Sequence, residues 1–223
     1  EYLSEAAFTR HKLKVELALI RALSKNGVCG QEIVREVEEA IRKISTREVY
    51  EEEKRIGHDI RALVNCIRAK ASDKAKPYIH MGATSYDIVD TANVLRFRDV
   101  VEKVVIPALL NLERTLCDIT LDQAENLQIG RTHGQHAVPI TFGFAMAEYV
   151  NRLGECVLRI KEAAERLRGK FSGAVGAYNA SSLLVDYPEM FEQDVLEELG
   201  LKAALHSTQI VPPEPMVRLM SEF

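Results

Sequence analysis

The sequence predicts an all-α fold in which a small helical N-terminal domain precedes a bundle of long helices. Apolar residues recur at intervals of three and four over long stretches, whereas few segments alternate with a period of two. The clearest repeat comprises Met146, Val150, Leu153, Val157, Ile160, Ala164 and Leu167. Its heptad-like spacing is typical of helices that pack in bundles. We place the helical N-terminal domain at residues 1–84 and the central long-helix bundle at residues 85–223.

Capping residues define the first helices. Apolar residues from Leu13 to Leu23 mark one helix, which Asn26-Gly27 ends. Ser45 and Glu48 form a capping box that begins a second helix. The apolar stripe of this second helix runs from Val49 to Ile67, so we expect one helix over that whole range.

The helices after residue 84 are longer. Thr84 and Asp87, three residues apart, are interpreted as an N-cap pair that opens the first of them. Apolar positions continue from Val101 to Ile119, and Pro107 predicts a kink among them because proline lacks a backbone N–H. Phe144 lies partly outside the main apolar seam of the next helix, which favours burial against a neighbouring subunit.

Composition excludes several classes of protein. The 223 residues are 47% hydrophobic, which is enough to bury a core. The net charge is −4 without a basic block, so we expect no nucleic-acid partner. The longest apolar run, Val104 to Leu112, is too short to span a bilayer, and no signal peptide opens the chain. Four widely spaced cysteines favour reduced thiols, and we therefore expect a soluble cytoplasmic protein without a membrane partner.

A polar segment, Gly130 to Pro139, contains the leading catalytic candidate, His133. Val138 precedes a proline and is pushed out of the α region, while Pro139 suits the first turn of a helix. We therefore predict that His133 lies on a loop at the start of a helix. An imidazole there can act as a general acid or base near neutral pH. The alternative is a histidine that only bonds a backbone carbonyl.

A second junction, around Thr84-Ser85, is a candidate anion site. The N-terminus of a helix offers spare N–H groups that attract carboxylate or phosphate. His80 precedes this junction, and it is interpreted either as a ligand contact or as a structural loop residue. His58 with Asp59 is interpreted either as part of a cleft or as an exposed pair on a charged helix.

Metal and dinucleotide sites are not expected. The histidines match no common zinc spacing, and the cysteines form no CxxC pair. The glycine-containing run at residues 172–176 follows no predicted strand, so it is a poor dinucleotide fingerprint. We interpret it as a loop near the site, and we expect no cofactor.

Taken together, four segments resemble the adenylosuccinate lyase family within the fumarase and aspartase superfamily. They are His80–Ala92, Gly130–Pro139, Ser172–Gly176 and Ser207–Gln209. The resemblance implies a mostly helical subunit whose long helices form the core of a homotetramer, with active sites shared between subunits. It implies β-elimination without metal or organic cofactor. The small-molecule partners would be adenylosuccinate, AMP and fumarate, together with the succinyl-carboxamide ribotide of purine biosynthesis.

The resemblance also implies a role for each matching residue. His133 resembles the general acid that protonates the departing nitrogen, and His58 resembles a second histidine that supports catalysis or touches phosphate. His80 resembles a phosphate contact. The remaining expected substrate-binding residues are Thr84, Ser85 and Thr132 around the carboxylates, with Asp59 and Gln209.

The chain also departs from the family pattern. The family's serine-bearing loop, Ser-Ser-x-Met-Pro-x-Lys-x-Asn-Pro, supplies the catalytic base and does not occur in these residues. Gly57 stands before His58, where the family commonly has a polar residue. The chain begins with Glu1 and ends in a predicted helix. We therefore expect a fragment or an incomplete chain that lacks its base.

Two groups of alternatives stay open. The first is another member of the superfamily, such as argininosuccinate lyase, fumarase or carboxymuconate cycloisomerase. The second is a catalytically silent helical assembly protein, since lens crystallins are related to this superfamily. Release of fumarate from adenylosuccinate, but not from argininosuccinate, would separate these possibilities.

Overall fold

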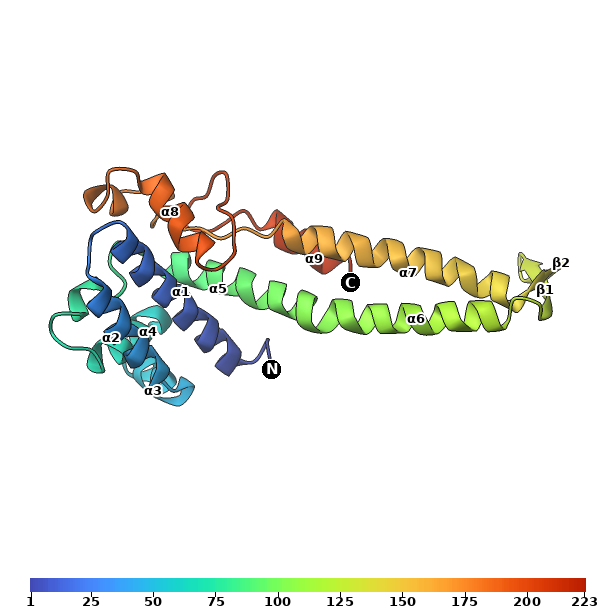
Figure 1. Ribbon diagram of the computed structural model, residues 1–223, viewed down its shortest axis with the longest axis horizontal. Coiled ribbons are helices and arrows are strands. Elements are labelled where there is room, and N and C mark those ends of the chain that lie inside the picture. Colours follow the sequence, from blue (N-terminus) through green and yellow to red (C-terminus); the bar gives the residue numbers. More distant parts are fainter. The chain divides into compact units, whose positions relative to one another are not determined.

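The computed structural model describes residues 1–223, and these residues are mainly helical (Figure 1). The predicted all-α class is confirmed. In chain order the elements are α1 (Glu5–Lys25), α2 (Gln31–Arg42), α3 (Thr46–Ile56), α4 (Asp59–Ala69), η1 (Lys76–Tyr78), α5 (Ser85–Val100), η2 (Val101–Val105), α6 (Ile106–Asp122), β1 (Leu127–Thr132), β2 (Gln135–Thr141), α7 (Phe142–Glu165), η3 (Ser181–Leu183), α8 (Pro188–Glu197) and α9 (Glu214–Ser221). No helix combines the length and the hydropathy that a membrane-spanning segment requires.

The chain divides into two compact units. The first consists of residues 1–98 and 167–217, and the second of residues 99–166 and 218–223. The first unit is therefore built from two separate stretches of chain. The sequence-based domain boundary at residue 84 stays a prediction.

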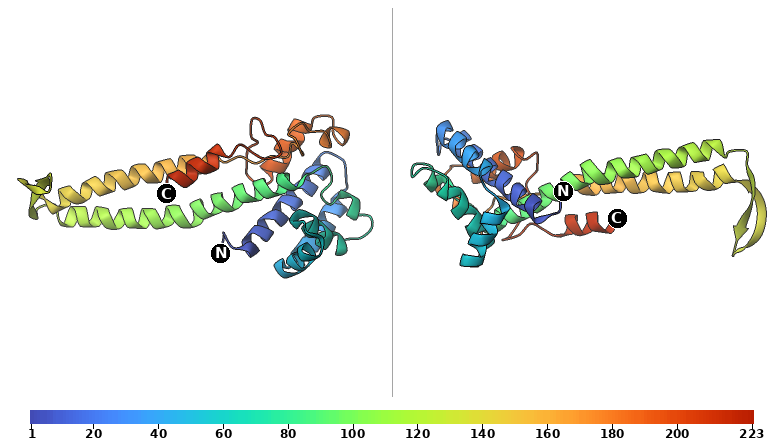
Figure 2. Two further views of the ribbon diagram at one scale, coloured as in Figure 1. Left: turned by 180° about the vertical axis from the view of Figure 1, so that it is seen from behind. Right: turned by 90° about the horizontal axis from the view of Figure 1, so that it is seen from below.

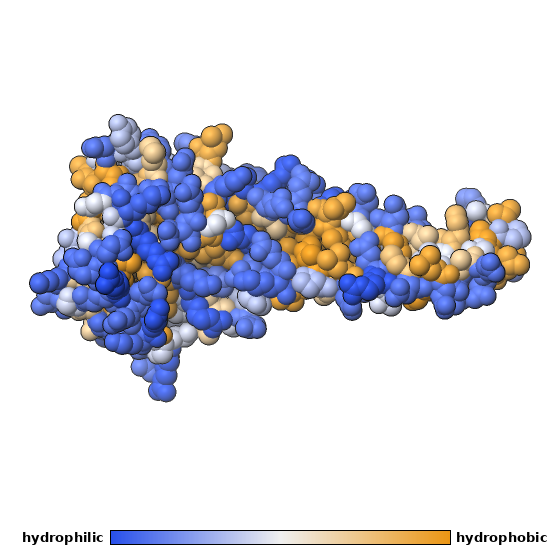
Figure 3. Space-filling model, viewed as in Figure 1, coloured by the Kyte–Doolittle hydropathy of each residue, from blue (hydrophilic) through white to orange (hydrophobic).

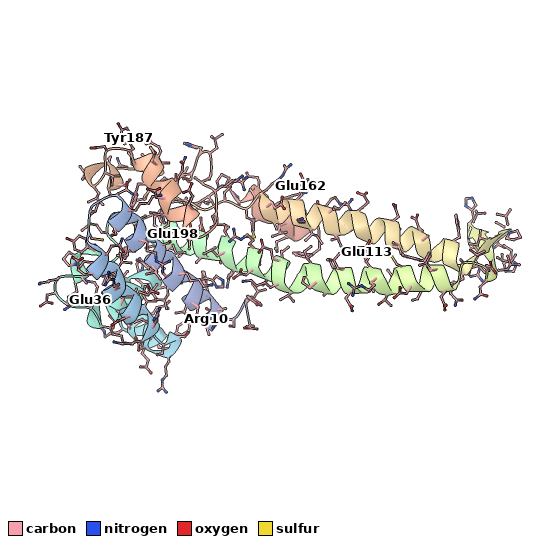
Figure 4. The ribbon with its side chains drawn as sticks, viewed as in Figure 1. Arg10, Glu36, Glu113, Glu162, Tyr187 and Glu198 are labelled. Atoms are coloured by element: carbon pink, nitrogen blue, oxygen red, sulfur yellow. The ribbon has the colours of Figure 1, made fainter.

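The first unit has a continuous apolar core. Helix α1 packs against α2 and α8, and α3 packs against α4. Its largest fully buried apolar side chains are Leu19, Ile20 and Leu23 of α1, Ile60, Leu63 and Ile67 of α4, Ile88 of α5, and Phe191 and Leu196 of α8. At the end of α8, Glu198 (labelled in Figure 4) accepts a hydrogen bond from Arg21 of α1 at 3.4 Å. Glu36 of α2, also labelled in Figure 4, accepts a hydrogen bond from the Ser72 backbone N–H at 2.5 Å.

Two predicted caps are confirmed, and one predicted helix is wrong. Asn26 caps the end of α1, and the Ser45 hydroxyl accepts a bond from the Glu48 N–H at 3.2 Å. The single helix expected from Val49 to Ile67 is two helices, because Gly57 adopts φ +71° and ends α3. A residue with a side chain is strained at that φ, so glycine there is a common helix stop.

The second unit is a pair of long helices, α6 and α7, which lie side by side and are joined by a β-hairpin (Figures 1 and 2). Glu113 of α6 (Figure 4) approaches Gly154 of α7 so closely that a Cβ there would lie 2.8 Å from its carboxylate oxygen. The interruption predicted at Pro107 takes the form of a π-helical turn, Val101–Val105, directly before α6. Such a turn accommodates a helix whose regular hydrogen bonding is broken.

The predicted loop at residues 130–139 is wrong. These residues belong to an antiparallel hairpin in which Ile129 pairs with Pro139, and α7 begins only after Thr141. The residue before a proline favours extended backbone, so Val138 fits a strand as well as a loop. In a two-stranded sheet both strands are edges, where proline is tolerated.

Candidate active site

A cavity of about 410 Å³ in the first unit brings together five of the predicted site residues. Its lining comprises Glu53, Gly57, His58, Asp59, Thr84, Ser85, Tyr86, Val89 and Gln209. These residues come from the end of α3, the start of α4, the start of α5 and the segment before α9. A larger cavity of about 460 Å³ shares Tyr86 but is mainly apolar. The smaller cavity is the better candidate because it contains the ionisable and hydroxyl groups that acid–base chemistry needs.

His58 connects the starts of two helices. It follows the turn at Gly57 and caps α4, where its Nδ1 accepts a hydrogen bond from the Arg61 N–H at 3.3 Å. In the neutral ring the proton therefore lies on Nε2, which is 3.4 Å from the Ser85 Oγ. The side chain is 52% exposed, so the ring can also meet a ligand in the cavity.

The start of α5 is fixed by Asp87. Its Oδ2 accepts a hydrogen bond from the Thr84 N–H at 2.9 Å, which confirms the predicted pairing of these residues at the helix start. Ser85 is the first residue of α5 and contributes to the cavity lining. The first N–H groups of a helix have no partner within it. The Thr84 and Ser85 hydroxyls together with this helix end can therefore hold an anion.

Asp59 is an ionised group at the edge of this cavity. The Lys12 ammonium lies 2.7 Å from its Oδ2. Burial alone would raise the pKa of Asp59, but the hydrogen bond and charge of Lys12 outweigh it, and the pKa lies below its ordinary value. The predicted contact of Asp59 with substrate stays a prediction.

His80 lies before the same helix start but does not line the cavity. Its backbone has φ +63°, and its Nδ1 is 2.7 Å from Oε1 of the buried Glu16. Burial would lower the pKa of His80, yet the charge and hydrogen bond of Glu16 raise it above its ordinary value. The ring is thus already paired within the protein, and its predicted contact with phosphate stays a prediction.

The glycine-containing run at residues 172–176 is a loop that packs against the segment carrying Gln209. Gly176 has φ +75°, and a Cβ added to it would lie 2.0 Å from the Ser207 carbonyl oxygen. The hydroxyls of Ser172 and Ser207 are hydrogen-bonded at 2.6 Å. Only glycine permits so close an approach, so the loop helps to set the position of the chain that leads to Gln209.

Two buried ionisable residues near this loop were not identified from the sequence. Glu192 of α8 accepts hydrogen bonds from the Phe171 N–H and the Tyr178 hydroxyl, both at 2.6 Å. Burial raises the pKa of Glu192, and these two bonds oppose the change. Lys170 forms a buried ion pair with Asp87. The one sequence signal for Lys170 was its position: a charged residue directly before Phe171 and the glycine-containing loop, which are otherwise uncharged.

His133 and Thr132 belong to the second unit and are exposed. Thr132 pairs with Gln135, which leaves His133 and Gly134 as a two-residue turn with φ values of +52° and +72°. Positive φ at both central residues is the type I′ geometry that suits the twist of a hairpin. The predicted site residues are therefore divided between the two units of the chain.

Comparison with known proteins assigns the family. The sequence matches the protein family described as "Lyase" over residues 2–221, which is nearly the whole chain. The chain belongs to this lyase family. Adenylosuccinate lyase from Archaeoglobus fulgidus is 37% identical over 210 residues, covering 94% of this lyase chain and 46% of the relative. Adenylosuccinate lyase from Aquifex aeolicus is 34% identical over 212 residues, covering 94% and 47%.

Solved structures show the same fold. The crystal structure of a fumarate lyase from Mesorhizobium sp. BNC1 superimposes with a TM-score of 0.87 at 25% identity, covering 99% of this lyase chain and 52% of the other. The chain spans about half the length of the curated relatives it matches. Among its residues, no group of three or more His, Cys, Asp or Glu side chains is arranged to hold a metal ion.

Proposed function

We propose that the full-length protein is an adenylosuccinate lyase of purine biosynthesis. It would eliminate fumarate from adenylosuccinate to give AMP, and from the succinyl-carboxamide ribotide in the same way. The observation that carries the proposal is the cavity in which His58, Thr84, Ser85 and Gln209 meet. The similarity to adenylosuccinate lyases from two organisms supports this choice of substrate over the related reactions.

The start of α5 is proposed as the seat for the succinyl carboxylates. Removing a proton from the carbon beside a carboxylate builds negative charge on that carboxylate. The N-terminal end of α5 and the Ser85 hydroxyl are already held before the reaction. Together with the Thr84 hydroxyl they would stabilise this charge more than they stabilise the ground state. Asp87 and His58 keep these groups in place through the contacts described above.

His133 is proposed as the general acid. As the C–N bond breaks, the departing nitrogen takes a proton, and a positioned acid contributes on the order of 10²–10⁴ in rate. The exposed hairpin turn leaves this imidazole accessible to a site in another subunit. The base that removes the carbon-bound proton is expected on the serine-bearing loop, which these residues do not include. The activity therefore has to be assayed with the full-length protein.

The second unit is proposed as the assembly surface of a cytoplasmic homotetramer with shared active sites. Helix α6 has no buried residue within the single chain. Large apolar side chains are exposed along α6, α7 and the hairpin, where Figure 3 shows hydrophobic surface: Leu112, Leu121, Leu127, Val138, Phe144, Tyr149 and Leu158. Exposed apolar surface of this kind favours association with other copies.

The test is fumarate release from adenylosuccinate by the full-length protein, with argininosuccinate and malate as parallel substrates. Carboxymuconate is assayed beside them by its own disappearance, because its lactonisation releases no fumarate. The proposal expects turnover of adenylosuccinate alone. Turnover of a different substrate would reassign the protein to a related enzyme. No turnover of any of them by a folded and assembled protein would favour a silent assembly protein.

A further inference from the structure

A buried ion pair lies beside the candidate site, and its lysine has no role in the chemistry proposed above. Lys170 and Asp87 both have side chains that are 0% exposed. The Lys170 Nζ donates hydrogen bonds to Asp87 Oδ1 and, at 2.9 Å, to the Gly173 carbonyl. Lys170 comes from the chain before the 172–176 loop, and Asp87 from the first turn of α5.

The Asp87 carboxylate joins three separate parts of the first unit. One oxygen accepts a hydrogen bond from the Thr84 N–H at 2.9 Å. The other accepts from Lys170 and, at 3.3 Å, from the Gly173 N–H. A single side chain therefore connects the start of α5, the buried lysine and the glycine-containing loop.

The backbone of Lys170 is also fixed by hydrogen bonds, in this case to Thr91. Thr91, fully buried on α5, accepts a hydrogen bond from the Lys170 N–H and donates one to the Lys170 carbonyl, both at 3.1 Å. At the preceding residue, a Cβ on Gly169 would lie 2.5 Å from the Leu196 side chain. The lysine therefore has little freedom to move relative to α5.

Stability alone does not account for this arrangement. Removing two charges from water is costly, and an apolar pair of similar volume is often as stable as a buried ion pair. What an apolar pair cannot do is accept hydrogen bonds from the Thr84 and Gly173 amides. What the ion pair provides, and an apolar pair would not, is therefore a fixed position of the Thr84 and Gly173 amides relative to each other.

We propose that Lys170 and Asp87 are a positioning pair that fixes the Thr84-Ser85 anion seat and the 172–176 loop in one geometry for binding the substrate's carboxylates. Lys170 acts through Asp87 and does not touch the substrate. The carboxylate part of this inference rests on the proposed function, whereas the structural part does not.

The structural part is tested by hydrogen exchange on the full-length Lys170→Met variant. We expect the Thr84 and Gly173 amides to lose protection together, since Asp87 is no longer held between them. Leu23→Ala, which removes fully buried apolar atoms from the same unit, is the control for general loss of stability. Protection of both amides unchanged in Lys170→Met, or lowered equally in Leu23→Ala, would overturn the proposal.

The binding part is tested with succinate and AMP as separate inhibitors. For Lys170→Met we expect the inhibition constant of succinate to rise at least about tenfold and that of AMP to change less than about twofold. A smaller folded fraction lowers the maximal rate but leaves both constants unchanged, so this readout separates positioning from folding. Equal changes for the two inhibitors, or none, would contradict a positioning role.

A double variant, Lys170→Met with Asp87→Asn, keeps the test decisive if the single variant does not fold. The double variant leaves no unpaired buried charge. The side-chain amide introduced by Asp87→Asn has one acceptor oxygen, so it can replace only part of the hydrogen bonding of the Asp87 carboxylate. Weaker succinate binding by this folded variant supports the proposal, and wild-type binding overturns it. If the wild-type protein neither binds succinate nor releases fumarate, the proposed function fails, and hydrogen exchange still decides whether the pair positions α5 and the loop.

Discussion

The two units of this chain use similar apolar helices in different ways. In the first unit, α1 buries Leu19, Ile20 and Leu23 completely within its own core. In the second, α6 is at least as apolar as α1 but has no buried residue. Leu121 is 76% exposed and Phe144 is 69% exposed. A regular apolar repeat therefore predicts a helix, but it does not say whether the apolar face of that helix is covered by the same chain or by another copy.

The candidate polar residues of the two units also differ in whether they have partners within the chain. In the first unit His58, His80 and Asp87 have partners within the chain that fix their orientation. In the second unit His133 is exposed on a hairpin turn. In the proposed function, the first unit supplies the anion seat at Thr84 and Ser85, and the second unit supplies the proton carrier His133. The following changes test this division of roles.

The largest effect is expected from His133→Ala. Loss of the general acid should lower kcat on the order of 10²–10⁴-fold and leave the affinity for AMP nearly unchanged. Steady-state kinetics with adenylosuccinate and inhibition by AMP measure the two quantities. His136→Ala, exposed on the same hairpin, is the matched control and should retain activity. Equal losses in the two variants would argue against a specific role for His133.

The next effect is expected on assembly. Leu158→Asp places a carboxylate on an exposed apolar position of α7, where a covered interface would bury it. We expect the assembly to dissociate at a concentration at least about tenfold higher than for the wild type, with a parallel loss of activity. Sedimentation or light scattering measures this. Leu183→Asp, at an exposed apolar position of the first unit, should assemble normally. A stable tetramer formed by Leu158→Asp would show that this face is not an interface.

A smaller effect is expected from Gly176→Ala. The added Cβ meets the Ser207 carbonyl, so the segment leading to Gln209 has to move. Gly27→Ala has the same backbone strain, at φ +73°, but meets no atom within 4 Å. Both variants should lose about 1–2 kcal/mol of stability from strain. Only Gly176→Ala should also raise the KM for adenylosuccinate. The increase is roughly tenfold if the lost contacts of Gln209 with the substrate are worth about 1.4 kcal/mol. An unchanged KM would show that the 172–176 loop does not position Gln209 for substrate binding.

The smallest effect concerns pH and the His80–Glu16 pair. Because the folded-state pKa of His80 is raised, its contribution to stability is fully present below the unfolded-state pKa and is lost as pH rises through the folded-state value. The free energy of unfolding should therefore fall with pH in this window, and Glu16→Gln should flatten the fall. Denaturant titrations at a series of pH values measure it. An identical pH slope in wild type and Glu16→Gln would contradict the assignment.

Much of the fold could be predicted from sequence because its signals are local. The cap at Ser45, the stop at Asn26 and the pair at Thr84 and Asp87 depend on residues three or four positions apart. The break at Gly57 was missed because the apolar stripe continues across it. The hairpin at residues 127–141 was missed because its proline and glycine residues are compatible with a loop as well.

The candidate site was predictable only in part, because only some of its residues have local sequence signals. His58, Thr84, Ser85 and Gln209 could be named from motifs, and the structure brings them into one cavity. Lys170 and Glu192 depend on pairings across 83 and 21 positions, which no local pattern reveals. The pairing of Glu16 with His80, 64 positions apart, was beyond prediction on the same grounds.

The most direct test of active sites shared between subunits is complementation between two full-length variants that are expected to be inactive, His133→Ala and Ser85→Ala. If each active site combines the anion seat of one copy with the hairpin of another, mixed assemblies contain some sites with both residues intact. Unfolding and reassembling the two variants together should then restore a substantial fraction of wild-type fumarate release. Mixed assemblies that form normally but stay as inactive as the separate variants would contradict it.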